Sequence, residues 1–173
     1  MDSKNENGFT LIELLIVVAI IAIIAAIAVP GLLRARMTGN ETSAIASLKV
    51  TTSSQVAYSS ACGNGGYASS YVVLGTPPTA GSAGFISADL GTSATPQKSG
   101  YNFTMAGGAG SSAGPNDCNG TATISTYYAS AVPMSLNTSG TRSFAVNAGN
   151  SIWQLTGGTA PTEPFGAPAT TIQ

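Results

Sequence analysis

The feature that most constrains this chain is an apolar run near its N-terminus, uncharged from Leu14 to Leu33. A helix needs about 20 predominantly apolar residues to cross the hydrocarbon core of a bilayer, so this run is long enough for one crossing. A single carboxylate, Glu13, lies at its start. Because a charge inside a membrane helix costs on the order of 2.5–3.5 kcal/mol, Glu13 is expected to have a partner.

A small residue precedes the apolar run, whereas a secretory signal is cut after its apolar segment, near an A-x-A pattern. Here Gly8 follows a short polar segment, and the sequence continues GFTLIEL to Leu14. This stretch resembles the processing motif of type IV prepilins and the related pseudopilins of secretion systems. The resemblance implies cleavage between Gly8 and Phe9 by a prepilin peptidase, which is also the N-methyltransferase that modifies the new Phe9 amine.

The resemblance also predicts an α+β pilin fold, in which one long N-terminal helix packs on a small antiparallel sheet. We divide the chain into a leader (1–8), a transmembrane and assembly helix (9–33), an amphipathic continuation of that helix (34–60) and a periplasmic or extracellular head (61–173). Composition supports the last boundary, because 18 of the 21 glycines and eight of the nine prolines lie in the head.

The helix is predicted to continue beyond Pro30 with a kink, because proline has no N–H to complete the helical hydrogen bond. Further along, Ile45, Leu48 and Val56 recur at helical spacing, which predicts one buried stripe and an outer face rich in serine and threonine. A break at Gly39–Asn40 and a spanning helix that ends before the proline remain alternatives.

In the head, short β-forming segments predict three to four antiparallel strands. These segments are 101–105, 122–129, 143–146 and 152–155, the last two forming a hairpin. The apolar piece 71–74 is placed in a connecting loop, and the glycine-rich segment 81–120 is interpreted as a flexible surface loop. The closing stretch, 156–173, is expected to be extended or loose.

Composition limits the chemistry that is available. Charged residues make up 8% of the chain, histidine is absent and the formal net charge is −1, so there is no case for nucleic acid binding and no candidate metal site or cofactor. Cys62 and Cys118 are the two cysteines. In an exported head they predict one disulfide, and two free buried thiols are the alternative.

In the pilin family, the carboxylate at the position of Glu13 attracts the Phe9 amine of a neighbouring copy, which sets the axial register. The alternative is that Glu13 reaches the lipid headgroups. The leading hypothesis is a structural subunit of a type IV pilus filament. Its expected partners are the peptidase, copies of itself and an assembly platform in the bacterial inner membrane, where the precursor crosses once with its N-terminus in the cytoplasm.

Two other functions remain open. The first is a pseudopilin or minor pilin of a type II secretion or DNA-uptake system, although an acidic calcium site typical of the major pseudopilin is missing, since Glu163 is the only acid in the last 50 residues. The second is a membrane-anchored periplasmic enzyme with Asp89 and Asp117 as a carboxylate dyad. Nothing in the sequence marks such a dyad, and we predict no catalytic residues.

Overall fold

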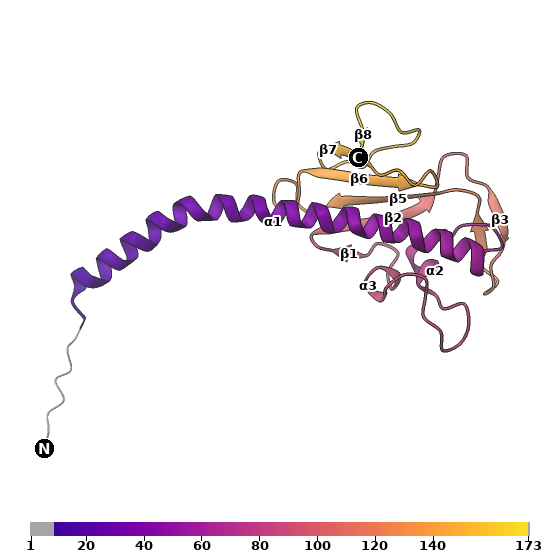
Figure 1. The fold of residues 1–173 in the computed structure, drawn as a ribbon, viewed down its shortest axis with the longest axis horizontal. Helices are drawn as coiled ribbons and strands as arrows, with labels where there is room; N and C mark the ends of the chain where they lie inside the picture. Colours follow the sequence, from indigo (N-terminus) through magenta and orange to yellow (C-terminus); the bar gives the residue numbers. More distant parts are fainter. Residues whose placement is uncertain (1–8, 173) are drawn as a thin grey trace, which may run out of the picture. The chain divides into compact units, whose positions relative to one another are not determined.

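The computed structural model describes residues 9–172 and divides into two compact units, one ending at Arg36 and one beginning at Met37. A single helix, α1 (Leu11–Ala61), contributes to both units (Figure 1). We call the second unit, Met37–Gln173, the globular unit. It joins the C-terminal part of α1 to antiparallel strands, so the α+β class is confirmed.

Helix α1 continues through Pro30 and past Gly39. The predicted continuation beyond the proline is therefore confirmed, while the kink stays a prediction. The alternative of a break at Gly39 and Asn40 is wrong, and one reason is visible in the globular unit. The Asn40 amide donates a hydrogen bond of 2.9 Å to the carbonyl oxygen of Ser139, so tertiary contact supports the helix at its weakest point.

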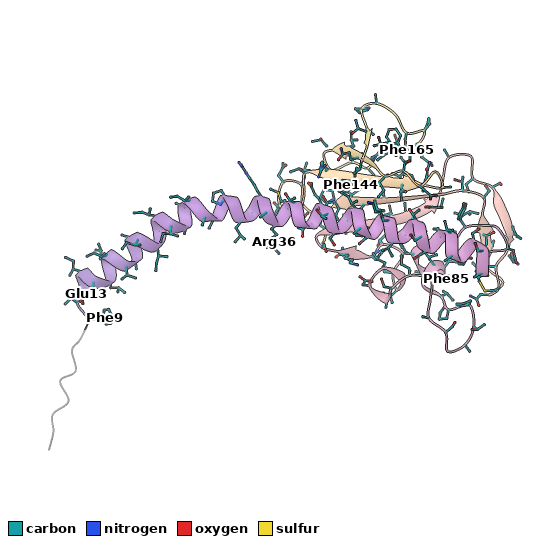
Figure 2. The ribbon with its side chains drawn as sticks, in the orientation of Figure 1. Phe9, Glu13, Arg36, Phe85, Phe144 and Phe165 are labelled. Atoms are coloured by element: carbon teal, nitrogen blue, oxygen red, sulfur yellow. A yellow bond between two sulfur atoms is a disulfide. The ribbon has the colours of Figure 1, made fainter. Side chains whose placement is uncertain are left out.

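The N-terminal part of α1 leaves its large apolar side chains exposed within the described unit (Figure 2). It contains a window of mean hydropathy 3.2 that is long and apolar enough to cross a membrane, and none of that window is buried. A helix that is apolar on all sides is stable in lipid or among other helices. By length and composition, this part of α1 is suited to either environment.

The C-terminal part of α1 buries one stripe in the globular unit, and that stripe is more polar than predicted. The buried residues recur every three or four positions: Glu41, Ala44, Ser47, Leu48, Thr51, Ser54, Gln55 and Tyr58. The placement of Leu48 is confirmed, whereas Val56 is 49% exposed and the serines and threonines expected outside lie partly inside. Apolar periodicity failed here because the neighbouring elements supply hydrogen-bond partners to this face.

Gln55 shows how a polar side chain is accommodated in this stripe. Its amide nitrogen donates to the Ala68 carbonyl and its amide oxygen accepts from the Ala68 N–H, both at 2.9 Å. The hydroxyl of a second stripe residue, Thr51, forms a hydrogen bond of 3.2 Å with the Tyr71 hydroxyl. Buried polar groups that keep their hydrogen bonds avoid the desolvation penalty of an unpaired group.

The main sheet has six strands, two to three more than predicted, with every neighbouring pair antiparallel. Its order is β1 (Gln97–Lys98), β2 (Tyr101–Gly107), β5 (Tyr127–Pro133), β6 (Arg142–Asn147), β7 (Trp153–Thr156) and β8 (Thr170–Thr171). The predicted hairpin is confirmed as β6–β7. The extra strands, β1 and β8, are two-residue edge strands, too short for a periodicity signal.

The predicted strand over 122–129 is two strands in different sheets. Its first part is β4 (Ala122–Ile124), which pairs with β3 (Ala113–Asn116) in a separate two-stranded sheet, and its second part opens β5. The interpretation of 81–120 as a flexible surface loop is also wrong, because the segment contains β1, β3 and the short helix α3 (Ala88–Gly91) in addition to β2, which covers the predicted strand 101–105. Likewise, the apolar piece at 71–74 forms helix α2 (Tyr71–Gly75), capped by Ser70.

One core unites α1, α2, α3 and the main sheet, and its bulk is aromatic. The largest fully buried aromatic side chains are Tyr58, Tyr71, Tyr101, Tyr127, Phe103 and Phe144. Alternation along β5 directs Tyr127, Ala129 and Ala131 into this core. Small alanines on the strand leave room for the rings and for the helix that covers them.

The closing stretch, 156–173, was predicted to be extended or loose, but it makes specific ring and hydrogen-bond contacts with the sheet. Phe165 stacks on Trp153 with ring centroids 5.3 Å apart, and the Tyr128 hydroxyl donates to the Pro161 carbonyl at 2.6 Å. Beyond these contacts, Ile172 donates its backbone N–H to the carbonyl of Ile152. The sequence did not signal this packing, because a few aromatic contacts, rather than an apolar run, hold the segment.

The disulfide between Cys62 and Cys118 is present, as predicted. It ties the end of α1 to the loop before β4, and the Cys118 N–H also donates to the Cys62 carbonyl at 2.9 Å. A bridge between residues 56 apart in sequence removes much conformational freedom from the unfolded chain. We therefore expect it to be a main contributor to the stability of the globular unit.

Replacing both cysteines, with Cys62→Ser and Cys118→Ser together, should lower the free energy of unfolding by about 4 kcal/mol in the chain-entropy description. Thermal unfolding of the full chain in detergent, followed by near-ultraviolet circular dichroism, measures the change. Reducing agent should lower the melting temperature of the wild type and leave that of the double variant where it is. A wild-type melt unaffected by complete reduction would contradict the expectation.

Candidate functional site

The N-terminus of α1 is closed by a reciprocal pair of hydrogen bonds between Thr10 and Glu13. The backbone N–H and the hydroxyl of Thr10 donate to Glu13 Oε2 at 2.9 and 2.7 Å, and the Glu13 N–H donates to the Thr10 hydroxyl at 3.3 Å. This is a capping box, for which the sequence signal is Thr-x-x-Glu before an apolar run. Sequence reasoning gave the motif a role in processing and in assembly, and missed its capping role.

The cap matters because the first N–H groups of a helix have no partner within it. In hydrocarbon an unpaired N–H is costly, and the box gives partners to the N–H groups of Thr10 and Glu13 at this helix end. Within residues 9–172, the hydrogen bonds to the Glu13 carboxylate all involve Oε2, which leaves Oε1 available to a further donor. Glu13 can therefore cap its own helix and accept a second hydrogen bond simultaneously.

The other residues of the predicted processing and assembly site lie close by along the chain. Phe9 is 86% exposed and immediately precedes the cap (Figure 2). Gly8 lies outside the described residues. Pro30 lies inside α1 within the exposed apolar part.

A buried ion pair attaches α1 to the sheet of the globular unit. Glu41, 5% exposed, receives two hydrogen bonds at Oε2 from the Arg142 guanidinium, at 2.6 and 2.9 Å, and two at Oε1 from the N–H and hydroxyl of Thr141, both at 2.8 Å. Arg142 also donates to the Gln154 side chain and lies 5.5 Å from the centre of the Phe144 ring. Sequence reasoning missed this pair because its members are 101 residues apart.

The protonation of Glu41 follows from these contacts. Burial by itself raises the pKa of this carboxyl, but the hydrogen bonds from Thr141 and the charge and hydrogen bonds of Arg142 outweigh it, so the pKa lies below its ordinary value. The folded globular unit consequently favours ionised Glu41. The contact stabilises the fold above the ordinary pKa and weakens as the pH falls through the folded-state pKa.

The structure does not join Asp89 and Asp117 as a catalytic dyad. Asp89 pairs with Lys98 at 2.7 Å, whereas Asp117 accepts from the Tyr58 hydroxyl at 2.7 Å and from two backbone N–H groups of its own turn. Burial and then the Asp117 carboxylate raise the pKa of Tyr58, which keeps its hydroxyl a donor. Each carboxylate therefore has a local structural role.

Comparison with known proteins finds similarity over part of the chain. Residues 3–29 match the family model described as the prokaryotic N-terminal methylation motif. Over 39 residues the chain is 59% identical to the type IV wide pilus major component PilA4 of Thermus thermophilus, a match that covers 22% of this chain and 30% of that protein. The matched stretch thus spans under a third of the relative's length. No solved structure matches this chain.

A prepilin-type methylation motif, an apolar N-terminal helix and an antiparallel sheet packed on the continuation of that helix are the features of a pilin-type subunit. Both matches cover only part of the chain, and together they show a likeness to type IV pilins in that part.

The buried ion pair yields a prediction about stability and pH. Glu41→Gln should lower the free energy of unfolding at pH 7 by about 2 kcal/mol, below the range for fully buried pairs because the Arg142 side chain is 37% exposed. The wild type should lose this advantage as the pH falls below about 4.5, and the variant should show a correspondingly shallower acid dependence. Denaturant unfolding of the full chain in detergent at several pH values measures both effects.

The matched control is Asp89→Asn, which removes the exposed ion pair with Lys98. It should cost less than about 1 kcal/mol, because water already hydrates both charges. Equal losses for the two variants would show that burial of Glu41 makes no special contribution.

Proposed function

We propose that this chain is the structural subunit of a type IV pilus filament, cleaved between Gly8 and Phe9, methylated at Phe9 and polymerised through α1. The observation that carries the proposal is the apolar part of α1, which is exposed throughout and has a carboxylate only at its capped start. Such a surface first needs lipid and then, outside the membrane, the equivalent helices of other copies.

Glu13 supports a specific contact between copies. Cleavage after Gly8 creates an ammonium at Phe9, and a cation and a carboxylate in an apolar environment are each costly unless they meet. With Oε2 occupied by the cap, Oε1 of one copy accepts the Phe9 amine of the next. A subunit added out of register leaves both charges unpaired, so this contact sets the axial spacing.

The proposed partners follow from the motif. A prepilin peptidase and N-methyltransferase acts on the precursor in the bacterial inner membrane, and an assembly platform adds the mature subunit to the filament. The N-terminus faces the cytoplasm, because the motif requires a peptidase on that side. Arg34 and Arg36, at the other end of the apolar run, then lie on the periplasmic side.

A pseudopilin is the second candidate, because its anchor and processing are the same. The C-terminal segment favours a pilin over the major pseudopilin. Glu163, the only acid in the last 50 residues, is engaged by the Ala109 N–H and the Asn147 amide and is not part of an acidic cluster. A minor pilin of either system has the same processing, so location and abundance separate the candidates.

Intact mass of protein sheared from the surface of the native host tests the proposal. We expect a species that begins at methylated Phe9 in long filaments. Gly8→Val should block cleavage and trap a heavier precursor in the membrane. Processed protein found only in the membrane fraction would favour a pseudopilin or minor subunit, and an intact Met1 terminus in wild-type protein would refute processing altogether.

A pair of variants separates the two roles of Glu13. Glu13→Gln keeps the capping box, which accepts Glu or Gln at this position, but removes the charge, whereas Thr10→Ala removes the cap and keeps the charge. If the ion pair sets the register, Glu13→Gln should insert and be processed normally, yet lower filament yield at least about tenfold, the effect of 1.4 kcal/mol. Thr10→Ala should retain more assembly. Wild-type yield from Glu13→Gln would rule out the ionic contact.

A further inference from the structure

The globular unit has few charged side chains, and most of them are matched internally. Glu41 pairs with Arg142 and Asp89 pairs with Lys98. Asp117 is satisfied by the Tyr58 hydroxyl and by the backbone of its own turn. Within Met37–Ile172, Lys49 is then the one cation without an ion pair, and Glu163, like Asp117, is a carboxylate that is engaged by hydrogen bonds alone.

Lys49 borders a groove between α1 and the C-terminal segment. The groove has a volume of about 610 Å³, and its wall combines hydroxyl and amide groups, among them Ser53, Asn150 and Ser151, with a similar amount of apolar surface that includes Ile152 and Ile172. Lys49 is the only charged residue that lines it. The positive charge of Lys49 favours an acidic side chain in this groove.

Glu163 is held in a fixed position on the segment that follows β7. Its Oε2 accepts the Ala109 N–H at 2.6 Å and its Oε1 accepts the Asn147 amide, which leaves further lone pairs on both oxygens. The stacked ring of Phe165 and the hydrogen bond from Tyr128 to Pro161 hold the segment on either side. A carboxylate fixed before binding loses little conformational entropy when it binds.

The groove and Glu163 lie on opposite sides of the main sheet. Tyr127 and Ala129 of β5 face the core that includes α1, so alternation places the intervening Tyr128 on the other face. Glu163 binds Asn147, the partner of Tyr128 across the β5–β6 ladder. Lys49, on α1, therefore cannot be the intramolecular partner of Glu163.

We propose that the Lys49 groove of one copy receives Glu163 of another copy, forming a contact between globular units in addition to the helix contact. Because the two surfaces differ, the contact is heterologous. A pair of copies leaves one groove and one Glu163 unoccupied, so further copies can add and the interaction propagates along a filament. The proposal rests on the proposed function, since it requires an assembly of identical copies.

Charge reversal tests this contact in the full chain in its native host. Lys49→Glu and Glu163→Lys should each lower the yield of sheared filaments at least about tenfold through like-charge repulsion, and the double reversal should restore most of it. Gln97→Glu, which adds negative charge at the opposite edge of the sheet, should assemble like the wild type. Equal loss from Gln97→Glu, or no loss from either reversal, would overturn the contact.

Carbodiimide, which joins a lysine to a carboxylate in direct contact, tests the same point in wild-type filaments. We expect an interchain Lys49–Glu163 peptide by mass spectrometry, absent from Lys49→Gln filaments. Failure to find it in intact, treated filaments would refute the contact and leave the proposed function standing. Absence of any wild-type filaments would instead refute the proposed function.

Discussion

The structure depends on one helix that meets two different environments. The N-terminal part of α1 exposes apolar side chains and suits lipid or a bundle of like helices, whereas its C-terminal part covers one face of the sheet and completes the core. Small strand residues such as Ala129 and Ala131 leave the space that Leu48 and the aromatic rings fill. Among residues 9–172 there is no other long helix to cover that face of the sheet. The same helix, α1, therefore carries the exposed apolar segment and completes the core.

Polar contacts, rather than a wide apolar stripe, attach this helix to the globular unit. Glu41 binds Arg142 and Thr141, and Gln55 pairs with both backbone groups of Ala68. Such contacts are directional, so they define the rotation of the helix on the sheet as well as contributing stability. The disulfide at Cys62 then holds the end of α1 against the loop that carries Asp117.

At the N-terminus of α1, a single carboxylate has two roles. Glu13 caps its own helix through one oxygen and offers the other, so one carboxylate serves both membrane compatibility and the proposed contact with the Phe9 amine. Within the globular unit, nearly every charge is satisfied by its own chain. Within residues 37–172, Lys49 has no ion pair and Glu163 is engaged by hydrogen bonds alone, and these two side chains form the proposed contact between copies.

Local signals predicted several elements correctly from the sequence: the apolar run up to Leu33, the motif that begins at Gly8, the hairpin of β6 and β7, and the disulfide, since the chain has only one cysteine pair. Tertiary structure alone decided which face of α1 is buried, because Thr51 and Gln55 become acceptable inside only when distant partners satisfy them. It also decided that 122–129 divides between two sheets, that the edge strands β1 and β8 form, and that Glu41 meets Arg142. These outcomes depend on pairings between segments far apart in the chain, which periodicity within a short window cannot register.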